Sequence, residues 1–443
     1  MVKKISLIVT GIVIIFLATG CIYIKSPEEL ARRPKRTLEE NEIANIIYDF
    51  LGANKTLTLA VNQREEAVRK VDLDKDGANE LLILYKKVNN QNQGNEGYGI
   101  LILKKKEDKW KEINKIVAPG FGFDFLQCED ITGDKRPEII IGANTESEIE
   151  KQLVIYSYHD GYFRDMYHSG YRNFSLGDLD KDGNIEVVLF NKEKDSDTKF
   201  IEVLKYTKGG LKDLDKYQIK SRSYYSNMTL GRASNDDIGI FIDNGIDSFN
   251  GYTELLIMKN NKLTDVLKNG VYGYYQRLEE NIIGSKDING DGIIEFGFMT
   301  NIKSTEDDYE EYLIPYIKEW YQWNGEKDIV LVRREYYNYD IGYKIVIPPK
   351  WRKEFIVLEK TDKSEVVFYS LKNIKELGKE IFSIKSLSID EWIEEKSDIY
   401  NNKEYIVLDK NRERVILGVI QNNSKESIYY IDEEKLKEIF LRI

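Results

Sequence analysis

The chain has 443 residues and is acidic, with 65 Lys and Arg residues against 76 Asp and Glu residues and a formal net charge of −11. This charge disfavours nucleic acid as a partner and suits the binding of cations. A chain of this length exceeds one ordinary hydrophobic core, so we expect two or more domains.

The first twenty residues have the layout of a secretory signal. Lys3 and Lys4 form a basic start, and the apolar run that follows is too short for a transmembrane helix. The small residues before Cys21 resemble the lipobox of bacterial lipoproteins. This resemblance implies that residues 1–20 are a signal peptide, and that lipid on Cys21 anchors the protein to the extracellular face of the cell membrane. The alternative is an ordinary signal peptide followed by an incidental cysteine.

A tether and a helix come next. Residues 21–37 contain the basic sequence RRPKR, which either rests on anionic lipid headgroups or is a solvated linker. The capping-box sequence TLEE then opens a segment with isoleucines at helical spacing. We expect one amphipathic helix over residues 38–51, in a segment that ends at residue 52.

An acidic loop recurs along the chain after this helix. The stretch DLDKDGNIE begins at Asp178 and has acids at positions 1, 3, 5 and 9 and glycine at position 6. Carboxylates this close repel one another unless a cation lies among them. The pattern also begins at Asp72 and Asp287 and, in part, at Asp130, while a copy near Gly231 has lost its acids.

These loops predict a metal site. Oxygen-rich loops without histidine select hard cations such as calcium, and position 12 lacks the glutamate that an EF-hand requires. A polar turn is the alternative, but three full copies and one partial copy favour structural Ca²⁺. The candidate ligands are Asp72, Asp74, Asp76 and Glu80; Asp130, Thr132, Asp134 and Glu138; Asp178, Asp180, Asp182 and Glu186; and Asp287, Asn289, Asp291 and Glu295.

Turn sequences mark a hairpin after each loop, namely KKEDKW, YHDGYF, TKGGL, KNNKL and WNGEK. Five loops and five hairpins at a period of about 50 residues predict a mainly β fold, a β-propeller of about five four-stranded blades over residues 53–340. The fifth repeat lacks a final strand, and residues 65–71 have no repeat of their own. We therefore expect this N-terminal strand to complete the last blade and close the ring.

The repeats resemble the FG-GAP or VCBS repeats of integrin-α-type propellers, in which D-x-D/N-x-D-G-x-x-E precedes a buried strand. The resemblance implies that a loop between adjacent blades binds calcium through positions 1, 3, 5, 7 and 9. The loops at Asp72, Asp178 and Asp287 match the pattern, whereas Lys135 replaces the glycine in the loop at Asp130. Propellers of the family usually have seven blades, and this chain shows five repeats.

The last hundred residues follow no such period. Alternating strands and two short helices predict a small α+β domain over residues 341–443. This domain is weakly similar to the PsbP-like modules of secreted proteins from Gram-positive bacteria.

The expected function is that of a non-catalytic binding or scaffolding lipoprotein with an unknown protein or glycan ligand. An extracellular polysaccharide-acting enzyme is an alternative, but the chain's two histidines, His159 and His168, belong to no nucleophile motif. A carbohydrate-binding protein is another, because sugars stack on aromatic rings; such rings also suit a strand. The aromatic segment contains Tyr309, Tyr312, Tyr316, Trp320, Tyr321 and Trp323.

Overall fold

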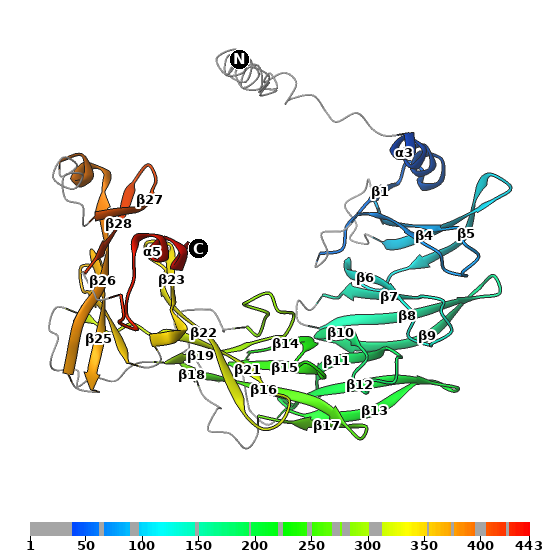
Figure 1. Cartoon of the computed structure of the whole chain (residues 1–443). Coiled ribbons are helices and arrows are strands. Elements are labelled where there is room, and N and C mark those ends of the chain that lie inside the picture. Colours follow the sequence, from blue (N-terminus) through cyan, green and yellow to red (C-terminus); the bar gives the residue numbers. More distant parts are fainter. Residues whose placement is uncertain are drawn as a thin grey trace, which may run out of the picture.

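The structure is a computed structural model, and it is mainly β, as the repeats predict (Figure 1). It describes residues 38–61, 66–88, 97–146, 150–194, 196–219, 225–245, 250–267, 275–276, 284–300, 312–351, 354–373, 376–394, 405–421 and 425–443. The signal peptide, Cys21 and the tether lie outside these residues. Within the described ranges, no helix is both long and apolar enough to span a membrane.

The chain begins with the expected helix, α3 (Leu38–Leu51), and continues into three successive antiparallel sheets. The first sheet contains β1 (Lys55–Leu57), β2 (Val68–Val71), β3 (Glu80–Lys87), β4 (Tyr98–Lys106) and β5 (Lys109–Val117). The second contains β6 (Phe123–Glu129), β7 (Glu138–Asn144), β8 (Lys151–His159) and β9 (Tyr162–Tyr171). The third contains β10 (Asn173–Gly177), β11 (Glu186–Lys192), β12 (Lys199–Thr207) and β13 (Gly210–Gln218).

Two further sheets complete the repeats. The fourth contains β14 (Tyr225–Arg232), β15 (Ile238–Gly245), β16 (Asn250–Lys259), β17 (Lys262–Asp265) and β18 (Tyr275–Gln276). The fifth contains β19 (Phe296–Thr300), β21 (Ile317–Trp323), β22 (Ile329–Asn338), β23 (Tyr343–Ile347) and β29 (Phe440–Arg442). An isolated bridge between Lys286 and Glu295 takes the place of its first strand.

Each acidic loop connects two segments that pair with each other in the same sheet. In the third sheet, for example, β10 pairs with β11 directly across the loop that begins at Asp178. The expectation that the loops connect adjacent blades is therefore wrong. The sheets are instead connected from the fourth strand of one to the first strand of the next, and Arg172 alone separates β9 from β10.

The hairpins that join the third and fourth strands occur where the turn sequences predict them. The backbone has positive φ at Glu107 and Asp108, at Asp160 and Gly161, and at Asn260 and Asn261. Positive φ at both central residues gives a two-residue turn whose twist matches that of the paired strands.

Each repeat sheet has two apolar faces, and neighbouring residues of a strand point into different cores. Leu82 packs toward the second sheet, whereas Ile83 packs against α3. Val187 packs toward the second sheet, whereas Val188 packs toward the fourth. This two-sided burial explains why the second strands read as continuous apolar runs rather than as alternating patterns.

The sheets form an open row in which the first and fifth lie far apart (Figure 1). The strand β2, from the segment 65–71, pairs with β3 in the first sheet, so the expectation that it closes a ring is wrong. The outer face of the first sheet is covered by α3, through Ile46 and Leu51. Elements that cover the ends of a repeat array allow it to stay open.

A sixth sheet covers the other end of the row. It contains β20 (Tyr312–Leu313), β24 (Phe355–Lys360), β25 (Glu365–Asn373), β26 (Glu376–Ser388), β27 (Tyr405–Lys410) and β28 (Arg414–Ile420). Tyr336 and Tyr343 of the fifth sheet share a core with Phe368 and Phe382 of the sixth. Because β23 and β29 come from the segment 341–443 yet lie in the fifth sheet, the sheet boundary does not fall at residue 340.

Three helical segments accompany the sixth sheet: η2 (Pro349–Trp351), residues 389–394 and α5 (Glu433–Ile439). The middle one has a capping box, in which the N–H of Ser388 donates to Glu391 Oε2 and the N–H of Glu391 donates to Ser388 Oγ. The terminal helix ends before Phe440, which begins β29 instead.

We expect that α3 stabilises the first sheet by covering it. The double substitution Ile46→Ala with Leu51→Ala should lower the free energy of unfolding by about 2 kcal/mol or more, because both side chains are 6% exposed. Urea denaturation measures this change. Tyr48→Ala is the matched control, since Tyr48 is 85% exposed on the same helix. Equal stability of the double variant and the wild type would contradict the covering role.

Candidate metal centres in the repeated loops

The four acidic loops have the same backbone conformation. Each has positive φ at positions 4 and 6, which lets the chain turn sharply around the first acidic residue. Glycine occupies position 6 in three loops, but Lys135 takes it at φ 71° in the loop at Asp130. The residues with positive φ are, in order, Lys75 and Gly77, Gly133 and Lys135, Lys181 and Gly183, and Gly290 and Gly292.

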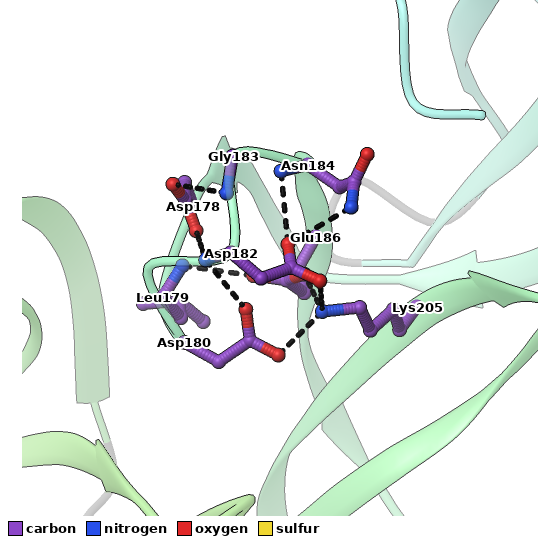
Figure 2. A network of polar contacts seen from close by, with 8 residues as sticks. All are labelled: Asp178, Leu179, Asp180, Asp182, Gly183, Asn184, Glu186 and Lys205. Carbon is purple, nitrogen blue, oxygen red and sulfur yellow. Dashed lines mark hydrogen bonds and ion pairs between the residues drawn. The ribbon is translucent and has the colours of Figure 1, made fainter. Parts of the chain in front are cut away.

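The hydrogen bonds of the loops are also shared, as the loop at Asp178 illustrates (Figure 2). Asp178 Oδ2 accepts from the N–H of Gly183 at 3.0 Å, and Asp182 Oδ1 accepts from the N–H of Asn184 at 2.9 Å. The same two bonds recur in the loops at Asp72, Asp130 and Asp287. The sequence pattern therefore specifies a turn even before any ion is considered.

The glutamate at position 9 fixes each loop to its sheet. Glu186 is fully buried, and its Oε2 accepts from the N–H of Leu179 at 2.8 Å. The corresponding distances for Glu80, Glu138 and Glu295 are 2.8, 3.0 and 2.8 Å. A buried carboxylate is costly without hydrogen bonds and a positive partner. The charge that compensates it differs between the loops.

Three loops gather carboxylates closely enough to hold a cation. In each of them three acids have one oxygen apiece within 4.8 Å of the others. The buried Oδ1 atoms of Asp72 and Asp74 accept no hydrogen bond. These oxygens suit a hard cation such as calcium. The three clusters are Asp72, Asp74 and Glu80; Asp178, Asp180 and Glu186; and Asp287, Asp291 and Glu295.

In the loop at Asp72, a lysine already lies among the acids. Lys104 Nζ is 2.6 Å from Asp74 Oδ2, 2.8 Å from Asp76 Oδ2 and 2.8 Å from Glu80 Oε1. Burial opposes the charge of Lys104, but hydrogen bonds to the three carboxylates outweigh burial and raise its pKa above the ordinary value.

The loop at Asp178 has the same arrangement (Figure 2). Lys205 Nζ contacts Asp180 and lies 2.6 Å from Asp182 Oδ2 and 3.2 Å from Glu186 Oε1. The pKa of Lys205 is raised for the same reason. Sequence reasoning missed both lysines. The signal was present, because each lysine ends an apolar run in the third strand of its sheet.

The loop at Asp287 has an amide in place of the lysine. Gln322 Nε2 donates to Asp291 Oδ2 and to Glu295 Oε1, both at 2.8 Å. Among the described residues, no lysine or arginine forms an ion pair with Asp287, Asp291 or Glu295. The guanidinium of Arg232 acts on Asp291 electrostatically from beside Gly292, but among the described residues this cluster has no ion-paired ammonium.

The loop at Asp130 is the least acidic of the four. Thr132 replaces one acid, and its Oγ1 lies 3.4 Å from Asp130 Oδ1. Within the described part of the chain, no side-chain cation forms an ion pair with Glu138. Burial, followed by the charges of Asp134 and Asp130, raises the pKa of Glu138 to about 7.

The fourth repeat has lost its acidic loop, as predicted, and forms a polar turn. Ser234 Oγ accepts from the N–H groups of Asp236 and Asp237, and Asp237 accepts from Lys181 Nζ of the preceding loop at 2.7 Å. Further contacts connect the other loops: Gly133 lies beside Asn184, and Gly292 beside Arg232. The loops thus follow one another along one edge of the row.

The other candidates form no comparable cluster. His159 and His168 are exposed, and each pairs with a nearby aspartate on the second sheet, Asp160 and Asp165. Trp320 and Trp323 are 2% exposed, so these two rings pack in the core. Tyr312, Tyr316 and Tyr321 are partly buried, and Tyr309 lies outside the described residues.

Comparisons with known proteins identify no family. No family model and no curated protein matches the sequence. A protein from Lactobacillus plantarum has a TM-score of 0.28 and 10% identity, over 73% of this chain and 88% of its own. Rhamnogalacturonan lyase YesW has a TM-score of 0.28 and 12% identity over 69% and 71%, and Chaetomium thermophilum Sqt1 has 0.29 and 8% over 68% and 68%. Likenesses this low carry no argument about this chain.

Glu138 should make stability depend on pH. Its pKa is higher in the folded chain than the ordinary value of 4.5, so the folded state holds a proton that the unfolded state releases between pH 4.5 and about 7. Stability is therefore lost as pH rises through this window, by at most about 1.4 kcal/mol per pH unit. Urea denaturation in metal-free buffer should show that Glu138→Gln removes this part of the slope.

Glu129→Gln is the control for this measurement. Glu129 pairs with Glu138 in the strand register but is exposed, so its substitution should leave the slope unchanged. A Glu138→Gln variant with the wild-type slope would show that burial of this carboxyl group does not set the pH dependence.

Proposed function

We propose that the protein is a membrane-anchored extracellular lipoprotein, whose row of sheets serves as a non-catalytic binding or scaffolding module stabilised by calcium. The anchor rests on the sequence Ala18-Thr19-Gly20-Cys21 at the end of an apolar run. The module rests on the row of sheets, which presents a continuous series of loops along one edge.

The observation that carries the calcium proposal is the cluster at Asp287. Its three carboxylates lie within 4.8 Å of one another, and one of them, Glu295, is fully buried. Asp287, Asn289, Asp291 and Glu295 would hold the ion, and calcium would supply a directly bound positive charge, which no ion pair provides among the described residues of this loop. Calcium accepts the flexible, oxygen-only coordination that such a loop offers. The proposed role is structural, because the acids fasten a loop to its own sheet.

We expect the melting temperature to depend on calcium. Calcium-binding extracellular modules have dissociation constants of about 10⁻⁴ to 10⁻³ M, and calcium at ten times that value stabilises one site by roughly 1.4 kcal/mol. A chelator should lower the melting temperature of the full chain, millimolar calcium should restore it, and magnesium should do so less well. Asp287→Asn with Asp291→Asn should remove the response, while Asp236→Asn in the fourth repeat should not. A wild-type protein indifferent to chelator refutes calcium binding.

We expect lipid on Cys21 to hold the protein at the membrane. Cells that produce Cys21→Ala should release the protein or retain it with its signal uncleaved, because no thiol remains to accept the lipid. Membrane fractionation and labelling with a fatty-acid analogue measure both outcomes. Cys128→Ala is the matched control, and it should stay at the membrane. A processed Cys21→Ala chain that remains membrane-bound would contradict the lipoprotein proposal.

A further inference from the structure

The residue at one position of the strand pairing determines which charge lies inside each repeated loop. It is the residue that lies opposite the position-9 glutamate, on the strand that follows the glutamate's strand in the sheet. In the first sheet Leu81 pairs with Leu103, which places Lys104 opposite Glu80. In the third sheet Val187 pairs with Leu204, which places Lys205 opposite Glu186.

The remaining repeats place other residues at this position. The pairing of Ile139 with Tyr156 puts Ser157 opposite Glu138. In the fifth sheet Gln322 stands opposite Glu295, and in the fourth Met258 stands opposite Ile238. The lysine thus occurs in two loops that have all four acids, and an apolar residue stands where the acids are lost.

We infer that Lys104 and Lys205 are built-in cations that take the place of a metal ion, so that the loops at Asp72 and Asp178 hold their fold without calcium. Each ammonium group touches the acids of positions 3, 5 and 9, which are ligands of the ion that the resemblance implies. The residues of these two loops therefore do not fit a bound metal as long as the lysine stays in place.

The competition between the two cations favours the lysine. Calcium binds oxygen at about 2.3–2.6 Å, and the ammonium of Lys104 lies 2.6–2.8 Å from the same oxygens, so both cannot be present together. Gln322 holds the same position in the fifth sheet, but its amide is neutral and can turn its oxygen toward a cation, which an ammonium cannot do. The lysine is tethered to the adjacent strand, which gives it a high effective concentration at the loop. Its ammonium contacts three carboxylates at once, so a weakly binding calcium ion must displace a permanent partner.

This inference rests on the proposed calcium site in one respect. It predicts that the loop at Asp287 responds to calcium and that the loops at Asp72 and Asp178 do not. The role of the two lysines can be tested separately. The double substitution Lys104→Gln with Lys205→Gln gives both loops the glutamine that the fifth sheet already has. The matched control is Lys106→Gln with Lys208→Gln, because these lysines lie two and three residues beyond the first pair along the chain and are exposed.

The experiment compares the melting temperature of the full chain in chelator and in millimolar calcium. In chelator, the double variant should melt at least roughly 2–4 °C below the wild type, because three carboxylates in each loop lose their cation. Calcium should recover most of this loss, so the shift on adding calcium should be larger than in the wild type. The control variant should behave as the wild type in both buffers.

Two results would overturn the inference. One is a double variant that melts like the wild type in chelator. The other is a loss of stability, or a failure to fold, that calcium does not relieve, because the lysines would then be ordinary ion-pair partners.

The reverse change, Gln322→Lys, separates this inference from the calcium proposal. The Gln322→Lys variant should lack the calcium response that the wild type shows, because the loop at Asp287 then has its own ammonium. A response of this variant equal to that of the wild type would contradict the inference. A wild type without any calcium response refutes calcium at Asp287, and the lysine double variant still decides the role of Lys104 and Lys205.

Discussion

The architecture depends on the two-sided burial of its sheets. Adjacent residues such as Leu82 and Ile83 are both completely buried and point into different cores. A sheet with two apolar faces needs a cover on each, so every sheet requires a neighbour on both sides. Neighbouring sheets provide these covers within the row. At its ends, unlike elements provide them: α3 on the first sheet and the sixth sheet on the fifth.

Each acidic loop is held against its sheet by the glutamate at position 9. The position-9 glutamate must point inward to accept from the N–H at position 2, and this brings a carboxylate into the apolar interior. Burial then requires compensation. Lysine provides it in two repeats and glutamine in part in a third. Burial raises the pKa of all four glutamates, and it does so to about 7 for Glu138, which has neither of these partners. One backbone thus accommodates different electrostatic solutions.

The sequence predicted the features that depend on local patterns. The period, the hairpin turns, α3 and the shared loop geometry all follow from residues close together in the chain. Strand partners are a different matter, because a short segment such as VRKV can pair with either end of the row. The sequence shows Lys104 at the end of an apolar run, but its partner is known only from the register, since Glu80 is far from it in sequence but opposite it in the sheet.

The sheets at the two ends of the row take their strands from different distances along the chain. The first sheet is built from five strands that are consecutive in the chain, and its cover α3 precedes it directly. The fifth sheet is complete only when β29, the last strand of the chain, pairs with β23. All strands of the sixth sheet except β20 lie between these two strands in sequence, so its folding brings the C-terminus back to Tyr343 and Ile345. Closing so long a loop is slow and depends on the sheet inside it. The first sheets can therefore form as local units, whereas the fifth and sixth sheets form together.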